Sequence, residues 1–497
     1  MARSVPLAAL LCLEAWLLFW HLDLLPLWGD ELFTLNTAQH PVGEIISILE
    51  RDVHPPLYYA LLHAWAALPL PWAGVAALRA FSALWALLAT LLLDLFWTRS
   101  WKGVERWLAL GLFALSPCLL LYGRMARSYS MQVALAVLCL GMLRRWMQEP
   151  ASTRLACGAF AAMVALLYTH YVPGVAVLAG FLLTGWSSVG LRRIAVFSSA
   201  AAVAYFPWVI IFIRALRRWG EASAFAANYA VSGHSSFEHV IKAGFGLVSL
   251  TIGESFLAAS LVLVPVILLL AVLGARTPGV SRQFIAMLAI AAGVGYIGVA
   301  RWESYPFIPA RLLWLLPFLS LAVALGIAQL RRPAIRIGVV LALLLSYASS
   351  DLSYFRRENF LNLGYVAPLP EIAARLNREA RAEDLIIVDA YNTDAQALGR
   401  LLSGRTPYII LEENKTSEAR RLARSAGTVW IARNTRDVSP GRITTQVQSE
   451  ACAGRLERDT LLVPYAPWQQ AAMRIAGLGP PPTHFYQLTA CDRAPGQ

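Results

Sequence analysis

The sequence predicts a polytopic α-helical membrane protein that ends in a smaller domain of alternating helices and strands. Of its 497 residues, 58% are hydrophobic and only 14% are charged, a balance that would make a soluble chain aggregate. Apolar runs long enough to cross a bilayer recur up to residue 348, and from about residue 350 the chain is rich in charges. We therefore expect a transmembrane domain over 1–349 and a separate domain over 350–497.

Eleven apolar segments are candidates for membrane-spanning helices. The first, at 5–27, is too long for a signal peptide and has no small-residue cleavage site, so we expect it to be retained. Glu14 within it is costly in lipid and is expected to face other helices. The other segments are 73–97, 107–122, 129–147, 155–169, 172–187, 194–213, 255–273, 283–300, 312–329 and 335–348.

Basic residues fall in alternate loops and so orient the chain. The short basic loops at 99–106, 144–154 and 192–193 are expected to be cytoplasmic under the positive-inside rule, as is the N-terminus. The opposite side then carries a polar outer loop at 28–72, the loop at 214–254 and, after an odd number of spans, the C-terminal domain. This loop asymmetry accounts for the net charge of +12, so we expect no nucleic-acid partner.

The outer loop 28–72 holds the residues that membrane packing explains least. Asp30 and Glu31 are adjacent, so in regular structure one can act as a general base while the other binds a metal, an acceptor or a helix N-terminus. The alternative is structural: the pair could be the N-cap and first-turn acid of the interfacial helix that follows. The stretch 52–59 (DVHPPLYY) suits a helix start in the headgroup belt, which leaves Asp52 and His54 unexplained. His54 could bond a phosphate, an acid or a backbone carbonyl. Amphipathic pieces at 43–50 and 57–68 are too short to span.

Three further polar positions lie on the same predicted side. The turn 122–129 (YGRMARSY) puts Arg124 and Arg127 at a helix start, against the positive-inside rule, which favours an anionic partner such as phosphate. Snorkelling toward lipid phosphate is the alternative. His170, within YTHY, and Arg311, just before an apolar span, complete the set. Ionisable residues that converge on one face indicate a polar cavity.

The region from residue 350 predicts a small α/β domain. Helical patterns at 371–381, 394–402 and 417–425 alternate with strand patterns at 385–388, 408–411 and 428–431, which predicts a parallel sheet. The pattern weakens after about residue 435, and no G-x-G-x-x-G opens a helix, so no nucleotide site is expected. Cys452 and Cys491 could pair if this domain lies outside the cytoplasm.

Taken in order, the acidic pair, D-x-HPPLYY, the arginine turn, YTHY and the late arginine resemble the lipid-dependent glycosyltransferases of the GT-C fold. The resemblance is to the bacterial branch of the dolichyl-phosphate-mannose–protein mannosyltransferase family, which includes the aminoarabinose lipid A transferases. It covers roughly residues 1–350. It implies a polyprenyl-phosphate-linked sugar donor, a lipid, glycan or protein acceptor, and inverting transfer at the outer face of the bacterial inner membrane.

The resemblance also implies roles for individual residues. Asp30 matches the family's catalytic acid and Glu31 its neighbour. Arg127 and Tyr129 match the family's Arg and Tyr in the turn before the fourth span, and Arg311 matches the Arg that often precedes the late span. From these matches and the shared outer face, the expected ligands of the donor phosphate are Arg127, Arg311 and Arg124, and the expected pocket residues are Asp52, His54, Tyr58, Tyr59, Tyr129 and His170. The family usually has a Glu where this chain has Met125. Either Glu31 or His170 replaces it, or the enzyme works without a divalent metal.

Two other classes compete with an enzyme. A flippase or transporter of lipid-linked sugars would need polar residues near mid-membrane and repeated halves with discontinuous helices. The ionisable residues here lie instead at one face, and no internal repeat is visible. A scaffold whose outer domain binds a partner leaves the acidic pair unexplained.

Overall fold

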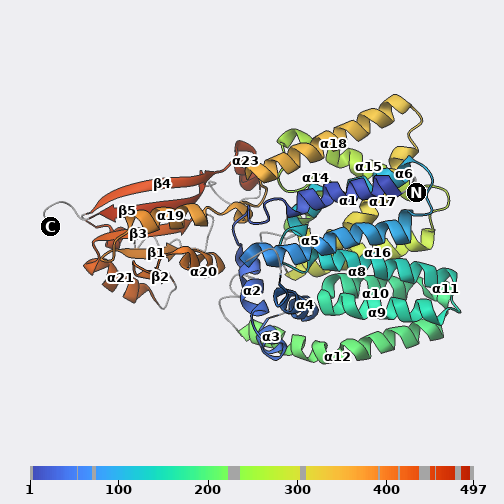
Figure 1. Cartoon of the computed structure of the whole chain (residues 1–497), viewed down its shortest axis with the longest axis horizontal. Helices are drawn as coiled ribbons and strands as arrows, with labels where there is room; N and C mark the ends of the chain where they lie inside the picture. The colour runs from blue at the N-terminus through green and yellow to red at the C-terminus, as the bar shows by residue number, and fades with distance from the viewer. Residues whose placement is uncertain are drawn as a thin grey trace. The chain divides into compact units, whose positions relative to one another are not determined.

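The computed structural model folds as two compact units (Figure 1). The first comprises Met1–Leu22 and Thr34–Asn359, and the second comprises Asp23–Phe33 and Phe360–Gln497. The predicted boundary at 349/350 falls within the last helix of the first unit. The structure describes residues 4–52, 54–69, 74–221, 236–302, 309–389, 392–411, 415–435, 448–453, 455–475 and 483–492.

The first unit is a helical bundle, as its apolar sequence predicts. Its helices are α1 (Ser4–Phe19), α3 (Val42–Leu49), α4 (Leu57–Ala66), α5 (Gly74–Leu93), α6 (Val104–Ala114), α7 (Pro117–Gly123), α8 (Tyr129–Gln148), α9 (Thr153–Thr169), α10 (Tyr171–Thr184), α11 (Trp186–Val189), α12 (Leu191–Glu221), α14 (Ser236–Ile252), α15 (Leu263–Ala275), α16 (Arg282–Trp302), α17 (Leu316–Ala328) and α18 (Pro333–Arg356). Short turns of other helix types adjoin α5, α15 and α17: η1 (Asp94–Thr98), η2 (Ala258–Val262) and η3 (Pro309–Leu315). Helix α2 (Gly29–Ala38) begins in the second unit and ends in the first.

The predicted count of eleven spans is not confirmed. Among the described residues, six helices are long and apolar enough to cross a membrane, or seven if the bent pair α6–α7 is one span. Helix α1 ends at Phe19, just before His21 takes a positive φ of 50°, so the predicted segment 5–27 is cut short. The loop predicted at 214–254 is also wrong in part, because Ser236–Ile252 forms the 17-residue helix α14.

Close helix packing in the first unit depends on glycine at two facing positions. A Cβ at Gly274 of α15 would lie 1.8 Å from the carbonyl oxygen of Ala322, and a Cβ at Gly326 of α17 would lie 2.0 Å from that of Leu270. Any larger side chain would push these two helices apart. In the same bundle α5 and α8 lie side by side (Figure 1).

Buried polar pairs tie the bundle at two further points. The Oγ1 of Thr90 in α5 donates to the Oε1 of Glu14 in α1 at 2.8 Å, so Glu14 faces another helix as expected. Farther along, Arg106 donates from Nε and Nη2 to the two carboxylate oxygens of Asp94, both at 2.9 Å. Such a bidentate pair fixes the geometry between η1 and α6.

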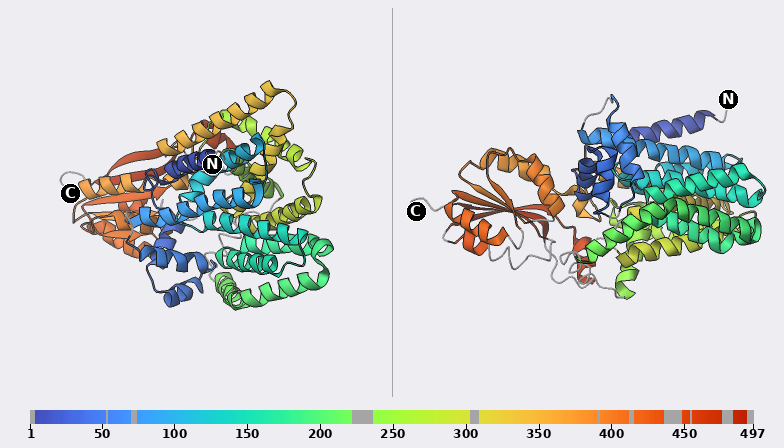
Figure 2. Two further views of the ribbon diagram at one scale, coloured as in Figure 1. Left: turned by 45° about the vertical axis from the view of Figure 1, so that its right-hand side comes forward. Right: turned by 90° about the horizontal axis from the view of Figure 1, so that it is seen from below.

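The second unit is an α/β domain with a mixed sheet of order β2-β1-β3-β5-β4. Its strands are β1 (Leu385–Asp389), β2 (Tyr408–Ile410), β3 (Thr428–Asn434), β4 (Leu456–Pro464) and β5 (His484–Asp492), and its helices are α19 (Leu369–Glu379), α20 (Asn392–Leu401), α21 (Thr416–Ser425) and α23 (Pro467–Ile475), with a short turn η4 (Leu363–Val366). Helices lie on both faces of the sheet (Figure 2). A disulfide joins Cys452 to Cys491.

The predicted parallel sheet is correct for only part of this domain. Strand β1 pairs in parallel with β2 and β3, but β5 runs antiparallel to both β3 and β4. The two antiparallel strands fall where the sequence pattern weakens. Strand β4 is a largely exposed edge strand, so its charged side chains obscure the strand pattern.

Candidate active site

Arg127 is the centre of a buried polar cluster in the first unit. It lies in the turn between α7 and α8, and its side chain is almost completely buried, with 3% of the residue exposed. Its Nη1 donates to the hydroxyl of Thr34 at 3.1 Å and to that of Tyr59 at 3.0 Å. Its Nη2 lies 2.7 Å from the Nε2 of His54. Residues from α2, α4 and the segment before α4 thus meet at one guanidinium group.

The contact with Arg127 determines how His54 is protonated. An arginine can only donate, so Nε2 of His54 accepts and the ring proton lies on Nδ1. Nδ1 is 3.1 Å from Oδ1 of Asp52, to which it then donates. Asp52, His54 and Arg127 therefore form one hydrogen-bonded chain, which explains why the HPP motif follows an aspartate.

The backbone of the arginine turn is held by three hydroxyl groups. The hydroxyl of Tyr58 lies 2.8 Å from Ser82 Oγ, which donates to the carbonyl oxygen of Arg127 at 3.1 Å. Ser130 donates in turn to the carbonyl oxygen of Ser82 at 2.6 Å. Tyr129 packs close by, with its ring centroid 5.9 Å from the Arg127 guanidinium carbon. These contacts preorganise Arg127, which is what a ligand site requires.

His170 and Arg311 adjoin this group. His170 caps α10, with its Nδ1 accepting from the backbone N–H of Val172 at 3.3 Å. Burial, and then the positive charges of Arg311 and Arg127 and the ring of His54, hold the pKa of His170 well below its usual value. His170 is therefore a neutral ring within electrostatic range of the guanidinium groups of Arg311 and Arg127. We call Thr34, Asp52, His54, Tyr59, Arg127, His170 and Arg311 the Arg127 cluster.

Arg311 is placed by a contact between η3 and α8. The side-chain amide of Gln132 donates to the carbonyl oxygen of Ala310 at 2.6 Å, which anchors the backbone next to Arg311. Gln132 is fully buried, so this bond forms away from water. Gln132 and Thr34 carry no sign of these roles in the sequence, because a glutamine or threonine within a helix is ordinary.

Arg124 makes a different set of contacts from Arg127. It donates to the carbonyl oxygens of Leu17, at 2.6 Å, and His21, at the end of α1. Its guanidinium carbon lies 5.2 Å from the ring centroids of both Tyr354 and Phe355. These contacts tie α1 to α18, and a cation suits a helix C-terminus.

Asp30 and Glu31 open helix α2 within the second unit. Both lie in the first turn, where the helix dipole favours negative charge, so a helix-stabilising role is open to either. Glu31 is 1% exposed, and Asp30 is half-buried. The preceding Trp28 packs edge-on against Tyr365, with ring centroids 5.3 Å apart.

Glu254 is a buried acid at the end of the predicted loop 214–254, and the motifs in the sequence predict no role for it. Its Oε1 accepts from the Tyr122 hydroxyl and, at 2.9 Å, from Ser249 Oγ. Burial raises its pKa to about 7, against the lowering effect of these two donors. A single acid between two apolar runs was the signal available in the sequence.

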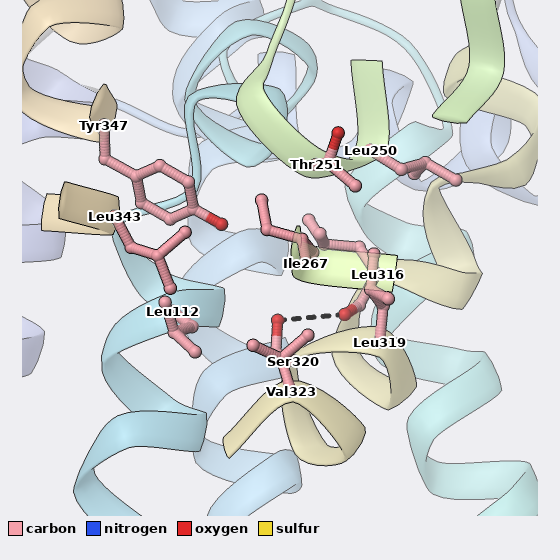
Figure 3. A pocket seen from close by; sticks show the side chains of 10 residues that line it. All are labelled: Leu112, Leu250, Thr251, Ile267, Leu316, Leu319, Ser320, Val323, Leu343 and Tyr347. Atoms are coloured by element: carbon pink, nitrogen blue, oxygen red, sulfur yellow. Dashed lines mark hydrogen bonds between the residues drawn. The ribbon is translucent and has the colours of Figure 1, made fainter. Parts of the chain in front are cut away.

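A small, mainly apolar pocket lies among α6, α14, α15, α17 and α18, with a cavity volume of about 10 Å³ (Figure 3). Its lining side chains carry no charge, so it does not suit a phosphate. Among the described residues, one group has the proximity of metal ligands: Cys452, Glu457 and Cys491. Its two cysteines form the disulfide, so it does not fit a metal ion.

Comparison with solved structures identifies a known fold. ArnT from Cupriavidus metallidurans in the apo state matches with a TM-score of 0.54 and 13% identity, over 99% of this chain and 98% of ArnT. The structure of the same protein bound to undecaprenyl phosphate matches with a TM-score of 0.51 and 12% identity, over 98% of each chain. No protein-family model and no curated protein sequence matches this chain. The chain therefore has the GT-C fold that its motifs predicted. The evidence for this fold is structural similarity, because the sequence identity is low.

Proposed function

We propose that this chain is a membrane glycosyltransferase that moves a sugar from a polyprenyl-phosphate-linked donor to an acceptor. The observation that carries this proposal is the Arg127 cluster, in which hydrogen bonds from three residues hold a buried guanidinium group and a second guanidinium group, of Arg311, lies within electrostatic range. Guanidinium groups held in this way suit a phosphate. ArnT, which shares the fold, has been solved with undecaprenyl phosphate bound, and this supports the same class of lipid here.

The proposed role of Arg127 and Arg311 is to stabilise the leaving phosphate. When the bond between the anomeric carbon and the phosphate oxygen breaks, the electron pair and the negative charge go to the lipid phosphate. Donors fixed in advance stabilise this charge without reorganising. His54 and Tyr59 hold Arg127 in place, and His170 supplies a neutral ring that does not compete for the phosphate. Arg124 is left out because its contacts serve α1 and α18.

The proposed general base is Asp30, by resemblance to the family. It takes the proton from an acceptor hydroxyl or amine as the nucleophile attacks the anomeric carbon opposite the phosphate, which inverts the configuration. A carboxylate base of this kind contributes about 10²–10⁴-fold. Glu31 is the alternative acid. Glu31 or His170 could also ligate a divalent metal in place of the acid missing at Met125.

The proposed location is the bacterial inner membrane, with the second unit on the periplasmic side. The disulfide between Cys452 and Cys491 supports this, because disulfides persist mainly in oxidising compartments. The acceptor is then a lipid, glycan or protein reached from that side. The positive-inside bias of the short loops agrees with the same orientation.

Transfer of a radiolabelled sugar by the purified protein tests the proposal. Polyprenyl-phosphate-linked mannose and aminoarabinose are offered with lipid A or peptide acceptors, with and without EDTA. Labelled acceptor supports a transferase. Movement of labelled donor across liposomes without transfer would support the flippase instead. Arg311→Ala should lower kcat, and with it kcat/KM for the donor, about 10²-fold and leave the KM for acceptor unchanged. A change confined to use of the acceptor would contradict its role.

A further inference from the structure

A second buried network lies against the arginine turn. Glu254 is 1% exposed, and its Oε1 accepts from the hydroxyls of Tyr122, in α7, and Ser249, in α14. Its Oε2 has no hydrogen-bond partner among the described residues. Burying a carboxyl group is costly, so such a residue needs a reason beyond packing.

The backbone around Glu254 is built to hold it in this place. Gly253 has a φ of +88°, and a Cβ there would lie 2.6 Å from the Cβ of Pro117 at the start of α7, so only glycine fits. Ser350 Oγ donates to the Ile252 carbonyl oxygen, and Ser255 Oγ donates to the Ser350 carbonyl oxygen, both at 3.1 Å. The carboxyl group is therefore fixed against α7 by its own turn and by α18.

From Glu254 the contacts lead to Arg127 through two tyrosine rings. The rings of Tyr122 and Tyr129 meet edge to face, with centroids 5.6 Å apart and an interplanar angle of 79°. The guanidinium carbon of Arg127 lies 5.9 Å from the Tyr129 ring centroid, at the outer limit of a cation–π contact. A hydrogen bond that fixes Tyr122 thus also limits where Tyr129 and Arg127 can lie.

We propose that Glu254 is a positioning residue that, through Tyr122 and Tyr129, holds Arg127 in the orientation that binds the phosphate of the lipid-linked donor. This inference rests on the proposed function of Arg127. The guanidinium group of Arg127 also hydrogen-bonds to Thr34, His54 and Tyr59, which precede the arginine turn in the chain, whereas Glu254 follows it. The Glu254 network contacts the arginine turn through α7 and α14, which are different elements from those that carry Thr34, His54 and Tyr59.

The test is binding of undecaprenyl phosphate to the purified full-length protein in detergent. Tyr122→Phe removes only the donated hydroxyl, and Glu254→Leu removes the acceptor. Each should raise the Kd about five- to tenfold, the effect of one hydrogen bond. The Kd of the double variant should be no higher than that of the single variant with the higher Kd, because both changes break the same bond. Glu254→Gln keeps an acceptor oxygen and should recover affinity to within about threefold.

Two controls separate positioning from a general loss of structure. Tyr296→Phe removes a hydroxyl that donates to the His239 carbonyl oxygen, away from the arginine turn, and should leave the Kd unchanged. In an Arg127→Lys background, Tyr122→Phe should add less than about twofold, because the group it positions is gone. A merely structural Tyr122 would give the same loss in both backgrounds, which would overturn the inference.

The remaining outcomes are equally decisive. An unchanged Kd in Tyr122→Phe, with normal binding by the wild type, overturns the positioning role and leaves the proposed function standing. Equal weakening by Glu254→Gln and Glu254→Leu also contradicts it, because the amide oxygen retains the bond. No binding by the wild-type protein would instead overturn the proposed function. If Glu254→Leu does not fold, Tyr122→Phe alone carries the test.

Discussion

Arg127→Ala is the most informative single change in the first unit. It removes the group that joins Thr34, Tyr59 and His54, and with it the donor proposed to meet the leaving phosphate. Loss of one preorganised donor to a developing negative charge costs about 10²–10³-fold in kcat, or about 3–4 kcal/mol. We expect kcat/KM for transfer from a polyprenyl-phosphate-linked sugar to fall by that factor.

Arg127→Lys refines the expectation. Lysine keeps the charge but cannot bond three partners in a plane, so we expect about a tenfold loss in kcat/KM. The matched control is Arg144→Ala. Arg144 is a half-buried arginine near the other end of α8 that donates to the Phe96 carbonyl oxygen at 2.7 Å. The substitution should lower the melting temperature without changing donor use by the folded protein.

The assay is steady-state transfer by protein that elutes as a single species from size exclusion, well below its melting temperature. Removing Arg127 also leaves the buried Thr34 and Tyr59 and the half-buried His54 with one bond fewer, so a drop in melting temperature is expected for both alanine variants. Only Arg127→Ala should lose kcat/KM. If it retains transfer within about threefold of the wild type, Arg127 does not stabilise the leaving phosphate.

Three further predictions concern stability. Asp94→Asn should destabilise the first unit by about 3–5 kcal/mol because it leaves Arg106 buried without its bidentate carboxylate, and a melting curve that matches the wild type would contradict this. Burial and then Arg311 lower the pKa of His170, so below a pH of about 6.5 the unfolded chain gains a proton that the folded chain does not. The melting temperature should therefore fall as the pH is lowered below about 6.5. It should fall less steeply in His170→Gln. Burial raises the pKa of Asp394 to about 6, so the folded state loses stability as the pH rises from about 4 to about 6. Asp394→Asn should therefore stabilise the second unit by about 2–3 kcal/mol at pH 7.5 and by little at pH 4. An equal effect of the substitution at the two pH values would refute this.

Sequence motifs predicted much of the Arg127 cluster, because each motif carries a residue type whose chemistry is recognisable. They could not separate Arg124 from Arg127. Helical spacing would put the two on one face, but the chain between them is not helical: the N–H of Met125 bonds to the Tyr122 carbonyl oxygen at 3.4 Å, and that of Arg127 to the Met125 carbonyl oxygen at 2.7 Å. This turn sends Arg124 toward α1 and Arg127 toward α4.

The limits of the sequence were clearest where long-range contacts decide the structure. Thr34 and Gln132 have no local signature, and their roles come only from partners distant in the chain. Glu254 looked like the last residue of a loop, because the helix α14 before it was not recognised. Strand β5 joins the sheet next to β3, across an interval of weak pattern that gave no indication of an antiparallel partner. Local pattern predicts elements well, but it does not specify which elements meet.

The acidic pair in α2 gives the most direct test of the central claim. Transfer from a polyprenyl-phosphate-linked sugar is measured for the wild type, Asp30→Asn and the neighbouring Glu31→Gln, each checked for folding. We predict an acceptor product of inverted anomeric configuration, and a loss in kcat of about 10²-fold or more for Asp30→Asn. Near-wild-type turnover by Asp30→Asn would contradict its role as the base, and the absence of any transfer by the wild type across the donors tested would contradict the proposed function.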